Sequence, residues 1–272
     1  MVFTKLEFDY MKGQVVGAKF LARLDFGLTE IEALRCIDSI ELGEHLSLSL
    51  DEKIKDKFCY VLDSQGVREI AFFAQDTNRF YKLIPTFDWP SFAIGSVPMH
   101  KISSPKADTE RKIAVLEPYG RVLDTCMGLG YTAIMAAQKA KEVITFEKDN
   151  NVEILAQANP VSQPLFSGKN IKNIEVRRED VSCAISSFKE GYFDCIIHDP
   201  PTFKLAPPLY TVSFYKELLT VLKRGGKMFH YTPLYKVKKG FDFPSRIKKR
   251  LQEAGFRNPK FSSGAGGILC WK

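Results

Sequence analysis

The chain of 272 residues is 45% apolar and carries a formal net charge of +7, from 39 basic and 32 acidic side chains. Its length accommodates one large domain and a smaller companion, and its apolar runs all fall short of the roughly 18 residues that a membrane-spanning helix requires. Residues 1–14 lack the layout of a secretion signal, so we expect a cytoplasmic protein without membrane partners. The six scattered cysteines and four histidines show no metal-binding spacing, which predicts reduced thiols and no bound metal.

Residues 1–100 show the pattern of a small α+β domain. We expect a short helix over residues 28–40. Short aromatic and β-branched runs follow, separated by Asp, Ser, Gly, Asn and Pro, which is typical of a small antiparallel sheet. These runs are residues 57–62, 67–73, 79–84 and 91–97. We expect this domain to help recognise the substrate.

Residues 101–272 show a different pattern, in which apolar strands alternate with helices. Such alternation predicts a parallel sheet with helices on both faces. Ser213 is expected to cap the helix over 211–223, and Gly225 to end it. The predicted strands cover residues 121–126, 142–147, 173–178, 193–199 and 226–232, and the predicted helices cover residues 131–140, 150–158, 181–188, 211–223 and 244–254.

The chain ends with two further predicted strands, residues 255–263 and 266–272. The connection between them is far too short for a parallel crossover, so they must run antiparallel. We therefore predict an α/β fold in which a Rossmann-like sheet of seven strands, the last one antiparallel, follows the small α+β domain.

A glycine turn follows the first strand of this predicted sheet. In the stretch DTCMGLGYTA, Gly128, Gly130 and Ala133 fit the G-x-G-x-x-A pattern of a dinucleotide-binding turn, and Glu147 follows at the distance at which such a turn finds its ribose ligand. Asp124 is less typical of a nicotinamide-binding turn, which usually has an apolar residue at this position. The glycine turn alone therefore does not identify the cofactor.

Three motifs in this order, DTCMGLGYTA, EKD at 147–149 and HDPPTF at 198–203, resemble those of class I S-adenosylmethionine-dependent methyltransferases, and closely resemble a family of predicted archaeal methyltransferases with the motifs DTCxGLGYTA and HDPPxF. The resemblance implies a methyltransferase domain over residues 101–272 and S-adenosyl-L-methionine (SAM) as the cofactor. The glycines would let the backbone pass close beneath the methionine portion, where a side chain would fill the space of the ligand.

The resemblance also assigns individual contacts to the cofactor. It places Asp124 near the amino-acid portion, Glu147 at the ribose hydroxyls and Asp180 at the adenine amino group. The implied cofactor-binding residues are Asp124, Cys126, Gly128, Gly130, Tyr131, Thr132, Glu147, Lys148, Asp180, Val181 and Asp199.

The DPP segment resembles the N/D-P-P-Y/F motif of methyltransferases that act on exocyclic amines of nucleobases. Asp199 and the carbonyl of Pro200 could each accept a hydrogen bond from an amine and so turn its lone pair toward the methyl group, while the prolines hold the loop. Thr202 separates Phe203 from the prolines, so Phe203 is either a base-stacking residue or a loop anchor. A D-P-P-x-F version occurs in rRNA cytosine C5 methyltransferases, but the cysteine nucleophile that they need is missing from the strand-five region. We therefore prefer nitrogen as the acceptor.

Three of the four histidines, His100, His198 and His230, fall at predicted loop or strand ends near the cofactor face. Without a second ligand at metal spacing, hydrogen-bonded structural roles are favoured over general-base or metal-binding roles. His100 is the best functional candidate because the loop that enters a methyltransferase domain often borders the donor site. The expected catalytic residues are Asp199, Pro200, Phe203 and His100.

Residues 223–260 hold twelve basic and two acidic side chains, a local net charge of +10. The loop and helix over 235–250 interleave basic and aromatic side chains, which suits the phosphates and unpaired bases of RNA. We therefore expect an RNA partner and N-methylation of a nucleobase amine.

Other activities stay open. They are methylation of a protein or a small amine, and aminopropyl transfer from decarboxylated SAM, as in polyamine synthases. The first loop of those synthases normally has an acid after the glycines, where this chain has residues 127–131. A non-catalytic binding module is disfavoured, because the acids at the four strand ends are intact.

Overall fold

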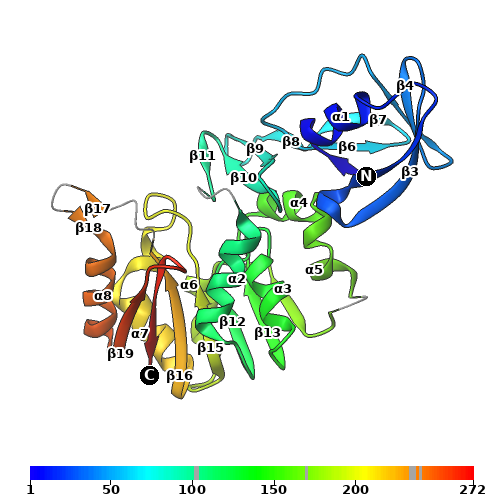
Figure 1. Cartoon of the computed structure of the whole chain (residues 1–272). Coiled ribbons are helices and arrows are strands. Elements are labelled where there is room, and N and C mark those ends of the chain that lie inside the picture. The colour runs from blue at the N-terminus through cyan, green and yellow to red at the C-terminus, as the bar shows by residue number, and fades with distance from the viewer. Residues whose placement is uncertain (101–103, 169–170, 233–236, 239–240) are drawn as a thin grey trace. The chain divides into compact units, whose positions relative to one another are not determined.

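The computed structural model describes residues 1–100, 104–168, 171–232, 237–238 and 241–272. The chain forms two compact units (Figure 1). Unit 1 comprises Met1–Lys106 and Asn151–Gln163, and unit 2 comprises Ala107–Asn150 and Pro164–Lys272. The sequence-based division into a recognition domain, residues 1–100, and a methyltransferase domain, residues 101–272, stays a prediction, because it concerns function. The return of the chain to unit 1 was not expected.

Unit 1 contains three small antiparallel sheets among its described residues, with strand orders β1-β6-β7, β2-β3-β4-β5 and β11-β10-β9-β8. The strands are β1 Val2–Phe3, β2 Lys19–Leu24, β3 Thr29–Arg35, β4 Ser39–Leu42, β5 Leu46–Ser49, β6 Tyr60–Asp63, β7 Gly66–Glu69, β8 Ala71–Ala74, β9 Arg79–Ile84, β10 Ser91–Ile94 and β11 Val97–Pro98. Its helices are α1 Lys5–Lys12, η1 Asp25–Gly27, α4 Asn150–Ala158 and η2 Pro160–Ser162.

The helix expected over residues 28–40 is wrong, because this segment forms strands β3 and β4. Its apolar residues recur at a spacing that also suits a helix, but both neighbours of β3 offer a hydrogen-bonding ladder. Ala33 pairs with Phe20 on β2 and with Leu42 on β4. Pairing with the two strands that flank β3 in the chain thus outweighed the local preference.

Unit 2 is built on a mixed sheet of seven strands in the order β14-β13-β12-β15-β16-β20-β19. Strands β12 to β16 are parallel, and β20 is antiparallel to both of its neighbours. The predicted α/β sheet with an antiparallel last strand is therefore confirmed. The strands are β12 Arg121–Asp124, β13 Glu142–Phe146, β14 Ile174–Arg177, β15 Phe193–His198, β16 Leu222–Tyr231, β19 Arg257–Ser262 and β20 Gly267–Trp271.

The helices of unit 2 are α2 Pro105–Leu116, α3 Tyr131–Ala137, α5 Pro164–Ser167, α6 Val181–Ala184, η3 Ile185–Ser187, η4 Pro207–Tyr210, α7 Val212–Val221 and α8 Phe243–Ala254. A short hairpin, β17 Val237–Lys238 with β18 Phe241–Asp242, precedes α8. A buried apolar cluster joins the sheet to α7 and α8, and it includes Leu123, Ile144, Ile196, Leu218, Ile247 and Leu251. Across the described part of the chain, the helices are too short or too polar to span a bilayer.

Two details around α7 differ from the expectation. The capping residue is Thr211, whose Oγ1 accepts a hydrogen bond from the Phe214 amide at 3.2 Å, and not Ser213. The helix ends at Val221, so Gly225 lies inside β16 with a φ of 75°. Gly225 therefore lies at the irregular start of a strand, where the register between β15 and β16 shifts, and not at the end of a helix.

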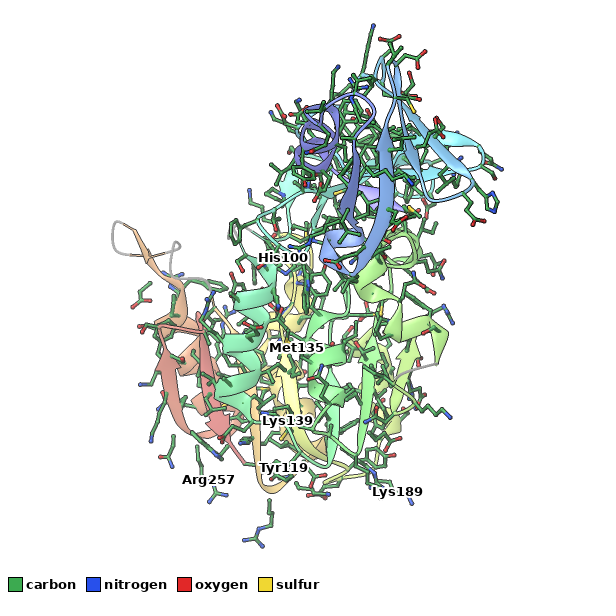
Figure 2. The ribbon with its side chains drawn as sticks, turned by 45° about the vertical axis from the view of Figure 1, so that its right-hand side comes forward. His100, Tyr119, Met135, Lys139, Lys189 and Arg257 are labelled. Atoms are coloured by element: carbon green, nitrogen blue, oxygen red, sulfur yellow. The ribbon has the colours of Figure 1, made fainter. Side chains whose placement is uncertain are left out.

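The parallel strands define two edges of the unit 2 sheet. Figure 2 shows Tyr119, Lys139, Lys189 and Arg257 along one edge, where strands begin. The carboxyl ends of β12, β13, β14 and β15 lie at the opposite edge, where ligands of doubly wound folds bind. Asp124, Glu147, Asp180 and Asp199 all stand at or just after these strand ends.

Candidate functional site

Asp124 is the last residue of β12 and is fully buried. Its Oδ2 accepts hydrogen bonds from Thr145 Oγ1 at 2.9 Å and from Thr132 Oγ1 at 3.2 Å. Among the described residues, its Oδ1 has no hydrogen-bond partner. Burial raises the pKa of Asp124 to about 7, against the opposing hydrogen bond from Thr145. A buried acceptor without a donor is costly, so a ligand that donates here would be stabilised.

The glycine turn connects Asp124 to α3. Gly128 has a φ of 54° and Gly130 a φ of 77°, a conformation that side chains resist. A Cβ atom on Gly130 would lie 2.2 Å from Leu165 Cδ1 of α5. The space beside Gly130 is thus filled by the protein itself. The need for glycine there comes from packing against α5, and not from the room for a ligand that the sequence suggested.

Glu147 follows β13 and ties that strand to the glycine turn. Its Oε2 accepts from the Gly128 amide at 3.0 Å, and its Oε1 accepts from the Asp149 amide at 3.0 Å. Burial raises the pKa of Glu147 to about 7, although these backbone donors oppose the shift. Each carboxylate oxygen keeps a second lone pair, which can accept from a ligand hydroxyl.

Asp180 follows β14 and caps α6. Its Oδ1 accepts from the Ser182 amide at 2.9 Å and from Ser182 Oγ at 2.7 Å, while its Oδ2 pairs with Lys148 Nζ at 3.0 Å. Burial favours a higher pKa for Asp180, but the hydrogen bonds and Lys148 outweigh it and lower the pKa. Asp180 and Lys148, both expected at the cofactor, are therefore brought together. Asp180 also has a structural role as a helix cap.

The remaining expected cofactor residues line the same segments. Cys126 is half-buried at the start of the turn, and burial raises the pKa of its thiol. Tyr131 and Thr132 are buried in the first turn of α3, and Val181 is buried at the start of α6. Their roles at a cofactor stay predictions.

Asp199, the first residue after β15, has a partner that sequence reasoning missed. Lys112 of α2 is 3% exposed, and its Nζ lies 2.6 Å from Asp199 Oδ2 and 2.7 Å from Asp108 Oδ2. The same ammonium lies 4.4 Å from the ring centroid of Tyr231 at the end of β16. Burial alone would lower the pKa of Lys112, but the carboxylates of Asp199 and Asp108 outweigh it and raise the pKa above its ordinary value.

The loop after Asp199 is held by Tyr210, a second residue that the sequence did not single out. Its hydroxyl donates to the Pro201 carbonyl at 2.7 Å, with the Pro200 carbonyl at 3.3 Å. The main-chain carbonyl of Tyr210 in turn accepts from Arg250 of α8 at 2.9 Å. Phe203 packs against the Tyr210 ring, with centroids 5.6 Å apart, yet is 41% exposed. Phe203 thus contacts the loop anchor and also presents ring surface to solvent.

His198 and His230 are fully buried, and each has both ring nitrogens hydrogen-bonded. His198 Nε2 lies 2.9 Å from the Leu209 carbonyl, and its Nδ1 lies 2.7 Å from Thr125 Oγ1. His230 Nδ1 lies 2.8 Å from the Tyr231 carbonyl, and its Nε2 lies 2.8 Å from the Tyr215 hydroxyl. Burial lowers the pKa of His198 well below its ordinary value and that of His230 to about 4. These contacts agree with the structural role that was favoured.

His100, the expected functional histidine, belongs to unit 1. Its Nδ1 lies 3.2 Å from Ser91 Oγ, which also accepts from the His100 amide at 3.2 Å. A catalytic role for His100 stays a prediction.

The basic segment 235–250 is described in part. Residues 235–236 and 239–240 lie outside the described residues. On α8, Arg246, Lys248 and Lys249 are exposed, whereas Arg250 is half-buried at its contact with Tyr210. The helix thus presents a basic outer face.

No protein-family model matches the chain. An uncharacterized protein of Methanocaldococcus jannaschii is 44% identical over 205 residues, which cover 73% of this chain and 69% of the relative. A spermidine synthase solved with the transition-state analogue AdoDATO superposes with a TM-score of 0.57 at 18% identity, over 71% of this chain and 69% of that one. MnmC2 of Aquifex aeolicus gives 0.52 at 16% identity, over 70% and 69% of the two chains. These structural likenesses show a shared fold.

Proposed function

We propose that this chain, which belongs to the family of the uncharacterized Methanocaldococcus jannaschii protein, is a SAM-dependent methyltransferase that methylates a nucleobase amine in RNA, because four acids stand at the strand ends of its unit 2 sheet. Asp124 carries the cofactor part of this proposal. Its buried Oδ1 lacks a donor among the described residues, which is the state expected of an acceptor that a ligand completes.

The acids at the ends of β12, β13 and β14 fit SAM. Asp124 would face its amino-acid portion and Glu147 its ribose, where the bond from the Gly128 amide holds the carboxylate in place. Asp180, already fixed by Ser182, would stand at the adenine. When bound, SAM supplies a methyl group activated by a sulfonium charge.

Asp199 would orient the acceptor. Its Oδ2 is engaged by Lys112, but among the described residues nothing donates to its Oδ1, which can accept a hydrogen from an amine. Asp199 would hold the amine nitrogen with its lone pair toward the activated methyl group that SAM would supply, and would pass to water the proton that the nitrogen loses on methylation. Tyr210 fixes the proline carbonyls that complete the alignment, which can supply several kcal/mol.

Two surface features support RNA as the carrier of the amine. The exposed ring surface of Phe203 lies four residues after Asp199 and can stack a base. The basic outer face of α8, formed by Arg246, Lys248 and Lys249, can hold phosphates, and α8 is joined to the loop anchor through Arg250.

Calorimetry tests the cofactor. We expect the wild-type protein to bind SAM more tightly than decarboxylated SAM, and Asp124→Asn to lose most of that affinity. Preference for decarboxylated SAM would instead support aminopropyl transfer, and binding of neither would contradict both enzyme activities. Transfer of labelled methyl to a single-stranded oligoribonucleotide, but not to a protein mixture, would support the RNA substrate.

A further inference from the structure

Asp108 is a buried carboxylate that has no role in the proposed function so far. It lies in the first turn of α2 and is 6% exposed. Its Oδ2 lies 2.7 Å from Lys112 Nζ, whereas its Oδ1 lies 3.7 Å from the guanidinium of Arg111, a side chain that is 46% exposed. The short contact of Asp108 is therefore with the buried ammonium.

Lys112 thus binds two carboxylates at once. Its Nζ lies 2.6 Å from Asp199 Oδ2 and 2.7 Å from Asp108 Oδ2. Two carboxylates against one ammonium give these three groups a formal net charge of −1. The arrangement therefore still favours positive charge, which the acceptor nitrogen acquires when it is methylated.

The second carboxylate changes how the ammonium meets Asp199. An ammonium opposite a single carboxylate is attracted to both oxygens and can bridge them. Asp108 attracts Lys112 Nζ as well, and the hydrogen bond from Lys112 goes to Oδ2 of Asp199. The other oxygen, Oδ1, stays available to a donor at the carboxyl end of β15.

We propose that Asp108 is a positioning residue of the acceptor site, which holds Lys112 on Oδ2 of Asp199 and so keeps Oδ1 of Asp199 open for the acceptor amine. This inference rests on the proposed function in placing the acceptor at Asp199. Asp108 acts through Lys112, and it does not contact the amine itself.

The double variant Asp108→Asn/Lys112→Met separates positioning from charge. It removes one carboxylate together with the ammonium, so the formal net charge of the group stays at −1. Methylation of a single-stranded oligoribonucleotide by the full-length variant should show a kcat lower by about tenfold or more, because Asp199 loses the group that orients it. The Kd for SAM should stay within about twofold of wild type. A wild-type kcat, or an equal loss of SAM affinity, would overturn the proposal.

The two single variants change the charge in opposite directions. Asp108→Asn raises the formal net charge of the group to 0, and Lys112→Met lowers it to −2. Charge alone would move kcat in opposite directions, whereas positioning predicts a lower kcat in both. The double variant should be no worse than Lys112→Met, because the two residues act as one chain. Opposite changes of kcat, or additive losses, would refute the positioning role.

The geometry can be tested without the reaction. A crystal structure of full-length Asp108→Asn should show Lys112 Nζ within hydrogen-bond distance of both oxygens of Asp199, and an ammonium still on Oδ2 alone would overturn the proposal. Absence of methylation by wild-type protein would instead contradict the proposed function. Lys223→Met is the control, because Lys223 pairs with Asp194 at 2.6 Å near the other end of β15. It should leave kcat unchanged.

Discussion

His198 and His230 face each other across β15 and β16, where they are register partners with ring centroids 4.5 Å apart and ring planes at 89°. Because a backbone carbonyl can only accept, His198 must carry its proton on Nε2 and His230 on Nδ1. The opposite ring nitrogens then accept from Thr125 and Tyr215. Protonation of both rings would place two buried cations in contact, because the ring centroids are only 4.5 Å apart.

This pair predicts loss of stability in mild acid. The unfolded chain binds a proton at each histidine below about pH 6.5, whereas folded His230 stays neutral to about pH 4. The free energy of unfolding should therefore fall as the pH decreases through this window, by about 2 kcal/mol for His230 at pH 5. Denaturant titrations at pH 7.5 and 5 measure the change.

Comparison with His230→Gln isolates this effect, because Asp124 and Glu147 titrate in the opposite sense. Their raised pKa values make the folded protein lose stability as the pH rises toward 7. The advantage of wild-type protein over His230→Gln should shrink by about 2 kcal/mol between pH 7.5 and 5. His45→Gln, at a histidine 87% exposed, is the control and should show no such change. An advantage that is constant with pH would contradict the prediction.

Cofactor binding should release protons. The pKa values of Asp124 and Glu147 are raised to about 7, and hydroxyl or ammonium donors favour the ionised carboxylates. The affinity for SAM should therefore increase with pH between about 6 and 7, by up to about tenfold per unit for each coupled carboxyl. Calorimetry at pH 6.5 in buffers of different ionisation enthalpy counts the protons. Proton uptake, or affinity independent of pH, would refute this coupling.

Tyr210→Phe should slow methyl transfer while leaving cofactor affinity intact. The change removes the hydroxyl that donates to the Pro201 carbonyl, a hydrogen bond worth about 1 kcal/mol, and loosens the loop that aligns the acceptor. We expect kcat to fall about tenfold, with the Kd for SAM within twofold of wild type. Tyr119→Phe, at the opposite edge of the sheet in Figure 2, controls for loss of a tyrosine hydroxyl and should change neither constant. Equal effects on kcat and SAM affinity would count against the alignment role.

RNA binding should depend on salt through α8. Lys248→Ala/Lys249→Ala removes two exposed cations, so the slope of log K against log salt concentration for a single-stranded oligoribonucleotide should decrease by about 1.4. Filter binding at several salt concentrations measures the slope. Lys189→Ala, at the other edge of the unit 2 sheet in Figure 2, should leave it unchanged. An unaltered slope in the double variant would remove α8 from the RNA interface.

The sheet of unit 2 could be predicted because its strands are short apolar runs and its helices lie between them. The same alternation predicted that the acids at the strand ends lie at one edge of the sheet, because parallel strands all end at that edge. Lys112 could not be found in this way. Its only sequence signal is the spacing of four from Asp108, which usually marks an exposed ion pair, and Asp199 lies 87 residues away. The site cation thus depends on a contact between segments distant in sequence.

In unit 1, the runs predicted over residues 57–62, 67–73, 79–84 and 91–97 overlap the antiparallel strands β6 to β10, so this part of the prediction is confirmed. The rest of unit 1 was predicted less well. Residues 28–40 were assigned to a helix, and nothing in 150–158 distinguished α4 from the other helices of the alternating pattern. Yet residues 151–163 belong to unit 1, where the side-chain amide of Asn151 donates to both carboxylate oxygens of Asp76 at 3.2 and 3.1 Å.

The return of residues 151–163 to unit 1 has a consequence for biosynthesis. A nascent polypeptide that has left the ribosome as far as residue 106 still lacks Asn151–Gln163 and cannot complete unit 1. The amino-terminal part must wait for the first two strands of the following sheet, β12 and β13, to emerge before its last helix arrives. A truncation after residue 106 would accordingly leave Asp76 without its amide partner, and the two units are better regarded as interleaved in synthesis than as consecutive modules.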